Sequence, residues 1–450
     1  MNSNSKKHQN CDKQGNCKDR LSELPDELLV DILSFLPIKD AVRTVLLRRF
    51  GNLWTLVRTI EYDFKLGGLF MWMVMKYHKS RTIDKLEIRD KCGPMKEELM
   101  ELISFGFKKK TKVLGIHYYE PRLHYSFSVP PRVVWRNQFI VSLHLTNVYL
   151  GFTRYNQIDM VSLKKLELNF VRVSNARIKN LLSEFPCLQE LVIKYPSELQ
   201  ALDFDAPNIE KLELDLCLKI RMPDGSGRSR YDERFSLNCP NLKVLHINEV
   251  CLELLDLIDV SSVREAKIKE CCLSRDYVDY FRKLRKKFRN AKIIQLGNTA
   301  YLELGKCGSE KLAFRENQWT RLALRPVSHG SCLLGICRSL INSQCLKELI
   351  IYAHVEFFCD CNMLLDELSS PCVMQQLKTV KIREYEKPCQ VLLQLIKFVL
   401  KSAVILERFV IVCKKKDELQ STEEKDFILQ LSGLPRVSQK AKVYVIDKKQ

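Results

Sequence analysis

The pattern in the sequence that most resembles a metal-binding motif is His354-Val-Glu356 followed by Pro371-Cys372. In zinc sites of the H-x-E and P-C-x-x-C type, one His and two Cys bind the ion and the Glu acts as acid and base. The second Cys of that pattern would fall at position 375, where this chain has Gln375. Because three protein ligands beside an open position cannot be assembled from this stretch, it does not predict a catalytic zinc site.

Thiols are the other residues with metal chemistry. The closely spaced ones are Cys11 and Cys17, Cys271 and Cys272, and Cys359 and Cys361. None of these pairs has a second pair or a His at zinc spacing, so core and surface thiols are the simpler interpretation. Eighteen cysteines in a chain of 450 residues without a secretory leader predict reduced, mostly buried thiols. We therefore expect a protein of the cytoplasm or the nucleus.

Phosphate-binding loops are not expected. Glycine contributes only 16 residues, and neither G-x-x-x-x-G-K nor G-x-G-x-x-G occurs. His117, His144 and His246 fall at outward positions of predicted strands. Two roles stay open for them: contact with a partner, or simple exposure to solvent. These patterns together predict a protein that is not an enzyme and that binds no cofactor or metal.

The stretch Asp19–Trp54 has the densest pattern in the chain. Its apolar residues recur at the spacing of one helical face, and they are Leu28, Leu29, Ile32, Leu33 and Leu36. Pro37 ends this helix, and a second helix is expected from Lys39 through Leu47, with Leu53 and Trp54 closing the set. A unit of about forty residues buries little core. We therefore expect its surplus apolar surface to be covered by another protein.

The order of these residues resembles an F-box. The stretch reads L-P-D-E-L-L from Leu24, I-L-S-F-L-P from Ile32, K-D-A-V-R-T from Lys39, R-R-F from Arg48 and L-W from Leu53. In that family the motif is a three-helix hook that docks on the Skp-type adaptor of a cullin-RING ubiquitin ligase. The alternative is an ordinary helical N-terminal subdomain, but periodicity alone would not produce both Leu-Pro pairs and the final Leu-Trp.

The resemblance implies an adaptor-binding surface on the hook. Carried over position by position, its residues are Leu24, Pro25, Leu28, Leu29, Ile32, Leu33, Leu36, Pro37, Val42 and Trp54. Family members have a Ser-containing stretch of four residues before the basic pair, where this chain has only Val45-Leu46-Leu47. This predicts a third helix that is one residue short and rotated by about 100°. Inserting a Ser between Leu47 and Arg48 is then expected to strengthen adaptor binding.

Beyond the hook one pattern repeats: an apolar residue, two variable residues, an apolar residue, one variable residue and a third apolar residue. Clear copies begin at Leu163, Leu188, Ile209 and Leu242, and weaker copies begin at Ile83, Thr111, Ile140, Val263, Ala291, Trp319, Leu346, Leu377 and Leu406. Its second half alternates with period two, which indicates a short strand with one face inward. Stretches such as 180–186 then form the returns, so that stacked coils bury a continuous core.

The repeats resemble the degenerate leucine-rich repeats of plant F-box proteins, and the last hundred residues resemble the FBD domain that follows them. The FBD resemblance rests on Cys345–Leu349, Leu377–Ile382, Val391–Ala403, Leu406–Ile411, Leu434–Ser438 and Ala441–Ile446. The implied fold class is α/β: a three-helix F-box, an irregular leucine-rich-repeat solenoid of parallel strands with helical or loop returns, and an FBD cap. The expected parts are a disordered leader at 1–18, the F-box at 19–64, the solenoid at 65–340 and the FBD domain at 341–450, with an exposed loop at 223–230.

Charge widens the list of partners. Lys and Arg number 73 against 54 Asp and Glu, which gives a net charge of +19. Nucleic acid, a membrane surface and acidic proteins are therefore all considered. In the densest basic run, 281–289, Phe281, Leu284 and Phe288 share one helical face, so the charges cover the solvent side of a packed helix. Nucleic-acid binding is thus the weaker interpretation, and the longest apolar run, near Gly67, is too short to span a bilayer.

Outward strand positions are where a target protein should bind, because inward positions are committed to the core. The predicted target-binding residues are Lys165, Glu167, Lys194, Lys211, Glu213, His246, Lys267, Lys269, Arg321 and Arg325. Charges are mostly positive from Lys267 onward, which favours an acidic or phosphorylated segment of the target.

The resemblances together imply a substrate-recruiting subunit of an SCF-type ubiquitin ligase. Its F-box would bind the Skp-type adaptor, and its repeats would hold a target protein while other subunits transfer ubiquitin. Two alternatives stay open. One is an interaction scaffold whose hook no longer binds the adaptor, and the other is a basic nucleic-acid-binding repeat protein.

Overall fold

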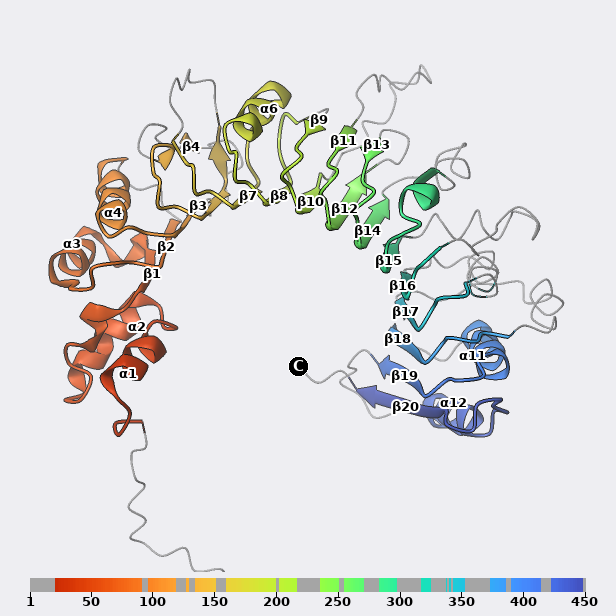
Figure 1. Cartoon of the computed structure of the whole chain (residues 1–450). Helices are drawn as coiled ribbons and strands as arrows, with labels where there is room; N and C mark the ends of the chain where they lie inside the picture. The colour runs from red at the N-terminus through yellow and green to blue at the C-terminus, as the bar shows by residue number, and fades with distance from the viewer. Residues whose placement is uncertain are drawn as a thin grey trace, which may run out of the picture. The chain divides into compact units, whose positions relative to one another are not determined.

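A computed structural model describes most of the chain (Figure 1). The described residues are 21–90, 96–118, 127–128, 134–150, 159–199, 202–216, 235–250, 255–270, 283–297, 317–324, 337, 340, 343–352, 373–385, 390–413 and 422–447. The chain divides into two compact units, residues 1–121 and 122–450. The predicted leader at 1–18 and the predicted loop at 223–230 lie outside the described residues.

Two short α-helices open the first unit. Helix α1 spans Asp26–Leu33 and helix α2 spans Ile38–Arg43. Each begins directly after a proline, Pro25 or Pro37, whose fixed φ and missing N–H are tolerated at a helix start. Two carboxylates in the first turn of α1 complement the helix dipole. The first predicted helix and both Leu-Pro boundaries are therefore present.

The segment after α2 differs from the predicted third helix. Thr44–Leu46 and Leu53–Leu56 form two short 3-10 helices, η1 and η2, and residues 47–52 form bends and turns between them. Gly51 and Asn52 lie in the middle of this segment, and both disfavour a continuous α-helix. A residue missing from a turn changes the length of that turn and rotates no helix. The predicted 100° rotation therefore does not arise.

Three parallel strands complete the first unit: β1 (Thr59–Asp63), β2 (Lys85–Asp90) and β3 (Val113–Tyr118). The returns contain η3 (Phe64–Leu66), α3 (Gly68–Tyr77) and α4 (Lys96–Lys108). Strand β1 was not among the predicted coils, although Val57, Ile60 and Tyr62 are fully buried and repeat the spacing of the other copies. The signal was present in the sequence, inside the range assigned to the F-box.

The second unit contains a long parallel sheet whose strands follow one another in chain order. Its described strands are β5 (Ser142–Thr146), β7 (Lys165–Asn169), β8 (Glu190–Lys194), β10 (Lys211–Asp215), β12 (Val244–Val250), β14 (Glu265–Glu270), β15 (Ile293–Leu296), β16 (Arg321–Leu324), β17 (Glu348–Tyr352), β18 (Thr379–Tyr385), β19 (Arg408–Cys413) and β20 (Lys442–Asp447). Each of the four clear and nine weaker repeat copies is followed two residues later by the start of a strand. The predicted α/β repeat architecture is confirmed.

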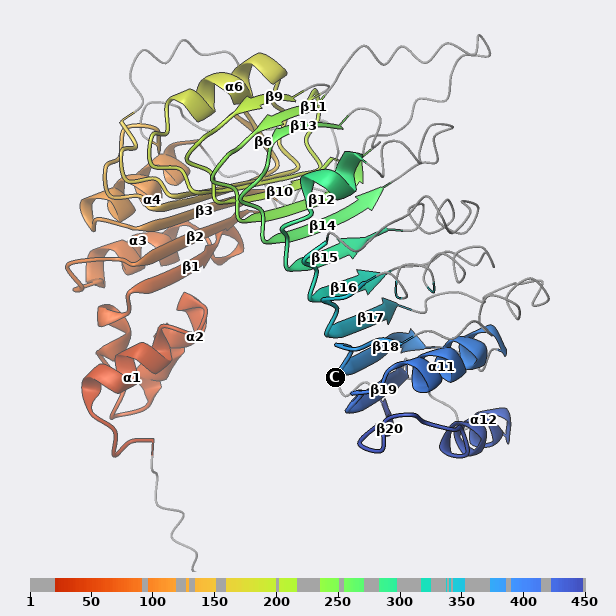
Figure 2. The same ribbon diagram turned by 45° about the vertical axis from the view of Figure 1, so that its right-hand side comes forward.

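The described returns of the second unit lie on one side of this sheet (Figures 1 and 2). They include three described helices, α6 (Asn175–Ser183), α11 (Gln390–Ser402) and α12 (Thr422–Ser432). A smaller parallel sheet orders β9 (Leu202–Asp205), β11 (Phe235–Asn238) and β13 (Leu255–Asp259) as β13-β11-β9, and β4 (Phe127–Ser128) pairs with β6 (Val148–Tyr149).

A continuous apolar row forms the core of the repeats. It consists of the second residue of each strand, which is in register with its neighbours: Leu166, Leu191, Leu212, Leu245, Ala266, Ile294, Leu322, Leu349, Val380 and Phe409. All of these side chains are buried. Since side chains alternate along a strand, the first and third residues face the opposite way; the first residues are half-buried or exposed, whereas the third is buried in β8, β16 and β17. Among the described helices, none is long and apolar enough to cross a membrane.

Candidate functional site

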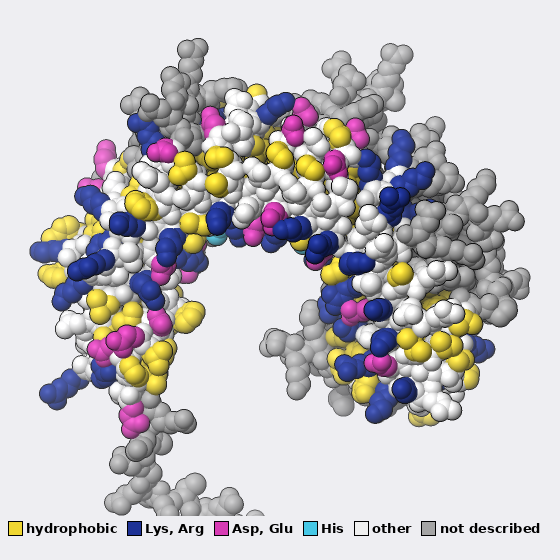
Figure 3. All heavy atoms as spheres, in the orientation of Figure 1, with side chains coloured by type: hydrophobic (Ala, Val, Ile, Leu, Met, Phe, Trp, Pro, Cys, Tyr) yellow, Lys and Arg dark blue, Asp and Glu magenta, His cyan; other side chains and the backbone are white. Residues whose placement is uncertain are grey.

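Among the large apolar side chains that the first unit leaves exposed, seven lie within 28–36 and 45–47, on or directly after α1 and directly after α2. We call this set the hook surface, and its residues are Leu28, Ile32, Phe35, Leu36, Val45, Leu46 and Leu47. Phe35 and Leu46 are 89% and 87% exposed, close to the exposure of an unfolded chain. Figure 3 shows hydrophobic side chains at the surface of this part of the unit. Exposed apolar residues that gather in this way mark a protein-binding face.

Three of the predicted adaptor contacts are not on that surface. Leu29, Leu33 and Trp54 are buried, with 0%, 2% and 6% exposure. They pack inside the hook because α1 must cover its inner face against η2, and a side chain cannot serve the core and a partner at once. Their contact with an adaptor stays a prediction, and in the structure these residues support the hook from inside. Of the remaining seven, Leu24 and Val42 are half-buried, and Pro25, Leu28, Ile32, Leu36 and Pro37 are exposed.

Four exposed residues were missed: Phe35, Val45, Leu46 and Leu47. Phe35 lies one turn beyond Ile32, and its backbone N–H donates to the Ile32 carbonyl, so the two share the outer face of α1. The signal for Phe35 was its helical spacing from Leu28 and Ile32. The apolar run Val45–Leu47 was placed at the end of the second helix and was not predicted to contact the adaptor, whereas its side chains are exposed in and after the 3-10 turn η1.

Arg49 closes the hook by joining the turn after α2 to the residues at the start of α1. Its guanidinium donates to the carbonyls of Ser22 and Leu24 at 3.2 and 2.9 Å. It also forms an ion pair with Asp26 at 2.5 Å. Because these bonds hold two segments 25 or more residues apart, Arg49 fixes the turn on which the apolar run Val45–Leu47 is presented.

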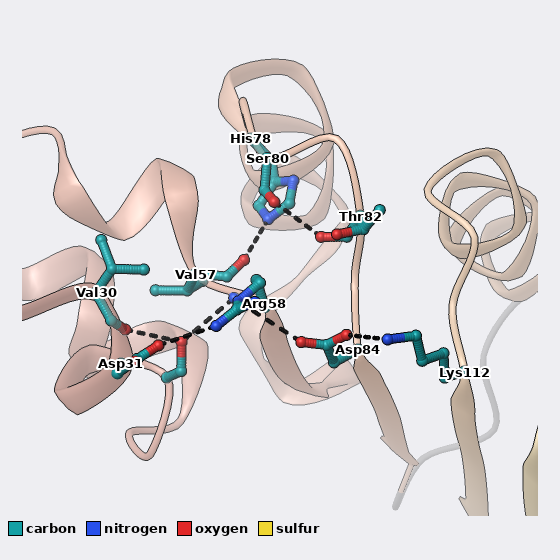
Figure 4. A network of polar contacts seen from close by, with 10 residues as sticks. Val30, Asp31, Val57, Arg58, His78, Ser80, Thr82, Asp84 and Lys112 are labelled. Carbon is teal, nitrogen blue, oxygen red and sulfur yellow. Dashed lines mark hydrogen bonds and ion pairs between the residues drawn. The ribbon is translucent and has the colours of Figure 1, made fainter. Parts of the chain in front are cut away.

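A polar network joins α1 to the first strands of the same unit (Figure 4). Arg58 forms ion pairs with Asp31 at 3.1 Å and with Asp84 at 3.6 Å, and Lys112 reaches Asp84 at 3.1 Å. The backbone N–H of Arg58 also donates to the hydroxyl of Ser34 at 3.3 Å. The hook is therefore tied to the repeat strands by bonds from several directions.

His78 is the buried polar residue of this joint. Its Nε2 lies 2.8 Å from the carbonyl oxygen of Val57, which requires Nε2 to carry a proton and donate. Burial lowers the pKa of His78 below its ordinary value of 6.5; the bond to Val57 raises the pKa, and nearby Lys109 lowers it further. The side chain is therefore neutral at neutral pH, and Nδ1 has no hydrogen-bond partner among the residues that the structure describes.

A buried charge lies between β2 and β3. The Glu87 carboxylate contacts His117 at 2.5 Å and Lys85 at 3.2 Å. Burial alone raises the pKa of Glu87, but the hydrogen bonds and charges of His117 and Lys85 outweigh burial and lower the pKa to about 2. Gly115 lies opposite Glu87 in the strand register, where a Cβ would overlap both the carboxylate and the His117 ring. The missing side chain of Gly115 makes room for this pair.

The predicted target-binding residues lie on the open face of the second unit's sheet. Lys165 and Glu167, Lys194, Lys211 and Glu213, His246 and Lys267 are all half-buried, while Lys269 is exposed. The parallel register brings residues from separate coils into one array, because each strand starts at the same repeat position. Arg325 lies outside the described residues.

Ion pairs neutralise much of that array. Lys194 contacts Glu213 at 2.8 Å, Lys267 contacts Glu265 at 2.6 Å, and Lys211 lies 3.8 Å from Glu190. The structure therefore places Lys267, which was predicted to attract an acidic target, beside a carboxylate of its own chain. Two cations bind one carboxylate further along: Arg321 and Lys381 both contact Glu348, at 2.5 and 2.7 Å. Burial alone raises the pKa of Glu348, but these two cations lower it below its ordinary value.

An aromatic pair lies at the ends of β7 and β8. Phe170 and Tyr195 stack with ring centroids 4.8 Å apart, and both are exposed. Both have a left-handed backbone, with φ of 52° and 50°, and Asn147 has φ of 59° after β5. Such a conformation is uncommon for bulky side chains, and it lets the chain leave each strand in the same direction.

The metal candidates are not brought together by the structure. Among the described residues, no group of three or more His, Cys, Asp or Glu is arranged to hold a metal ion. The stretch from His354 to Cys372 lies outside the described residues, as do the thiols Cys11, Cys17, Cys271, Cys272, Cys359 and Cys361.

Comparison with known proteins agrees with the arrangement of a hook, a repeat sheet and a distinct C-terminal part. The FBD family model matches residues 369–411, which include all of β18 and α11 and the start of β19. An F-box/FBD/LRR-repeat protein of Arabidopsis thaliana is 28% identical over 274 residues, which are 56% of this chain and 58% of that protein. An F-box/LRR-repeat protein of the same plant is 28% identical over 251 residues, 53% of this chain and 66% of that protein.

A longer match extends over nearly the whole chain. Another Arabidopsis thaliana protein, whose name combines F-box, FBD and LRR repeat, is 25% identical over 424 residues, 86% of this chain and 91% of that protein. The first-mentioned relative is matched over little more than half of its length. The matched FBD region and these relatives show that the chain is similar to plant F-box/FBD/leucine-rich-repeat proteins, and the parallel repeat sheet agrees with that similarity.

Proposed function

We propose that this protein is the substrate-recruiting subunit of an SCF-type ubiquitin ligase and catalyses no reaction itself. The hook surface binds a Skp-type adaptor, and the open face of the repeat sheet binds a target protein. Ubiquitin transfer is then accelerated by effective concentration, because the target's lysines are held near the ligase. The observation that carries the proposal is the exposure of seven large apolar side chains around α1 and after α2.

The proposed contact set follows the exposed residues. Phe35 and Leu46 are the anchors, because they offer the largest accessible apolar side chains on the hook surface. Leu28 and Ile32 extend the contact along α1, and the exposed prolines Pro25 and Pro37 flank it. The buried residues of α1 and η2 support this surface from inside the hook.

The domain boundaries also belong to this proposal. The F-box is assigned to residues 19–64, the repeats to 65–340 and the FBD domain to 341–450, in the cytoplasm or the nucleus. The FBD part continues the parallel sheet through β18, β19 and β20. Strand β20 has a described partner on one side only, in β19, so the FBD part caps the array.

The test is co-purification of the full-length chain with a purified Skp-type adaptor. The variant F35S/L46S should lose binding, whereas L69S should keep it. Leu69 is a matched control because it is 88% exposed and lies in α3, away from α1 and α2. Failure of the unmodified protein to bind at micromolar concentration would favour an interaction scaffold without a ligase role.

A further inference from the structure

The residues that directly precede β14 to β18 form a row of positive charge. Four of the five are basic, Arg264, Lys292, Lys347 and Lys378, and the fifth is Thr320. We call the four the basic row. The row therefore places a basic residue directly before four of five successive strands, and Figure 3 shows Lys and Arg side chains gathered along this part of the sheet.

Backbone hydrogen bonds fix the spacing of the basic row. The N–H of Lys292 donates to the Arg264 carbonyl at 2.8 Å, and the N–H of Lys378 donates to the Lys347 carbonyl at 2.9 Å. Thr320 continues the chain of bonds between these two pairs. Neighbouring strands are about 4.8 Å apart, so the row extends about 19 Å from first to last residue. An extended peptide covers that length with about six residues.

The basic row is poorly neutralised by the chain itself. Arg264 and Lys347 are exposed and have no carboxylate partner among the described residues. Lys292 donates to a neutral amide oxygen of Gln318 at 2.9 Å. Lys378 lies 3.5 Å from Glu407, and both side chains are about half exposed. This contrasts with Lys267 and Arg321 on the open face, whose partners are nearer and less exposed.

From these observations we infer that the basic row binds an extended, carboxylate-rich segment of the target protein, which runs across the strands β14 to β18. That the bound segment belongs to a target protein rests on the proposed function. That the segment is rich in carboxylates rests on the structure. A single phosphate fits less well, because tight phosphate sites converge several donors on one point and this row places one cation per coil. Nucleic acid is the competing class of polyanion.

The experiment uses the full-length protein with fluorescent peptides of about ten residues, long enough to cover the row. One peptide consists of glutamates, one replaces them by glutamine, and one carries a single phosphoserine in the glutamine background. A thymidine oligonucleotide of similar length tests nucleic acid. Binding is measured by fluorescence anisotropy at about 0.1 M salt, where the Debye length is about 10 Å.

Two variants with double charge reversals distinguish the effect of the basic row on peptide binding from the effect of the protein's net charge. R264E/K347E reverses its two cations without a described partner, and K286E/K401E makes the same change of net charge on exposed residues of the returns. The glutamate peptide should bind the unmodified protein, bind R264E/K347E roughly tenfold more weakly, and bind K286E/K401E nearly as well as the unmodified protein. The glutamine peptide should not bind.

Several results would overturn the inference. Equal loss in both double variants would mean that the peptide responds to net charge only. Tighter binding of the single phosphoserine peptide or of the oligonucleotide, with the same loss in R264E/K347E, would assign the row to a different ligand. Adaptor co-purification of the same variants keeps the two proposals apart, because a protein that binds adaptor but no glutamate peptide refutes only the basic row.

Discussion

The hook and the repeat coils use apolar residues in opposite ways. In α1, Leu29 and Leu33 are buried while Leu28 and Ile32, on neighbouring positions of the same helix, are exposed. In a coil such as β10, Leu212 and Leu214 are both buried, and Lys211 and Glu213 form the open face. The hook therefore keeps apolar side chains at its surface, where a partner can bind them. A coil such as β10 buries its apolar side chains against neighbouring coils and exposes charged ones.

This difference indicates two kinds of binding. An apolar surface gains affinity by removal from water, which depends weakly on salt. A charged face contributes specificity and rapid association, and both decline as ionic strength rises. Binding of the proposed adaptor to the hook should thus depend little on salt concentration. Binding of the proposed target to the repeat sheet should depend on it strongly.

Truncating adjacent leucines of α1 should separate support from contact most clearly. Leu29→Ala removes a fully buried side chain and is expected to cost roughly 2–5 kcal/mol of unfolding free energy. Leu28→Ala removes a side chain that is half exposed and should cost well under 1 kcal/mol. Chemical denaturation of both variants measures the difference. Equal losses would show that the two faces of α1 are not distinct.

Filling the space beside Glu87 should give the next largest effect. In Gly115→Ala the new methyl group displaces the buried carboxylate from His117, with an expected loss of about 1–3 kcal/mol. Gly51→Ala is the control, since its Cβ would meet backbone atoms only at 3.8 Å or beyond. Thermal unfolding of both variants checks the prediction, which a Gly115→Ala protein as stable as the Gly51→Ala protein would refute.

Acidification should weaken the first unit through His78. Its pKa is lowered in the folded state, so the unfolded chain takes up the proton first as pH falls below about 6.5. Protonation therefore favours unfolding, with a slope of at most about 1.4 kcal/mol per pH unit. His78→Gln keeps a donor toward Val57 and should flatten the stability profile between pH 6.5 and the lowered folded pKa. An unchanged profile would exclude His78 as the titrating group.

Removing Arg58 should have the smallest effect. Its ion pairs with Asp31 and Asp84 are about half exposed, and such pairs contribute roughly 0–1 kcal/mol each. Arg58→Ala is expected to lower the unfolding free energy by about 1 kcal/mol or less, and high salt should reduce the difference. A loss of several kcal/mol in a denaturation experiment would mean that the joint between hook and strands depends on this one side chain.

The repeat fold could be predicted because the residue pattern within a single repeat determines where its strand lies. An apolar residue such as Leu166 must be buried wherever the pattern occurs, so the pattern alone locates the strand. Strand β1 follows the same rule and was missed only because Val57 fell within the range assigned to the hook. The length of each return varies, but that does not alter where a strand begins.

The binding faces were less predictable because they depend on neighbours. Spacing placed Leu29 and Ile32 on one apolar stripe but could not say which of them faces the hook's own core. Pairs such as Lys381 with Glu348 join coils 33 residues apart, and they form only because the parallel register aligns them. The basic row was not predicted for a related reason: Arg264 and Lys347 lie just before their strands, outside the alternating strand positions whose side chains were expected to face a partner.

Calorimetric titration of the full-length chain with a purified Skp-type adaptor, at low and at high salt, tests the central claim most directly. We expect a Kd in the micromolar range or tighter that changes little with salt, about a hundredfold weaker binding for F35S/L46S, and unchanged binding for L69S. Absence of binding, or equal weakening by L69S, would contradict the assignment of the hook surface as the adaptor site.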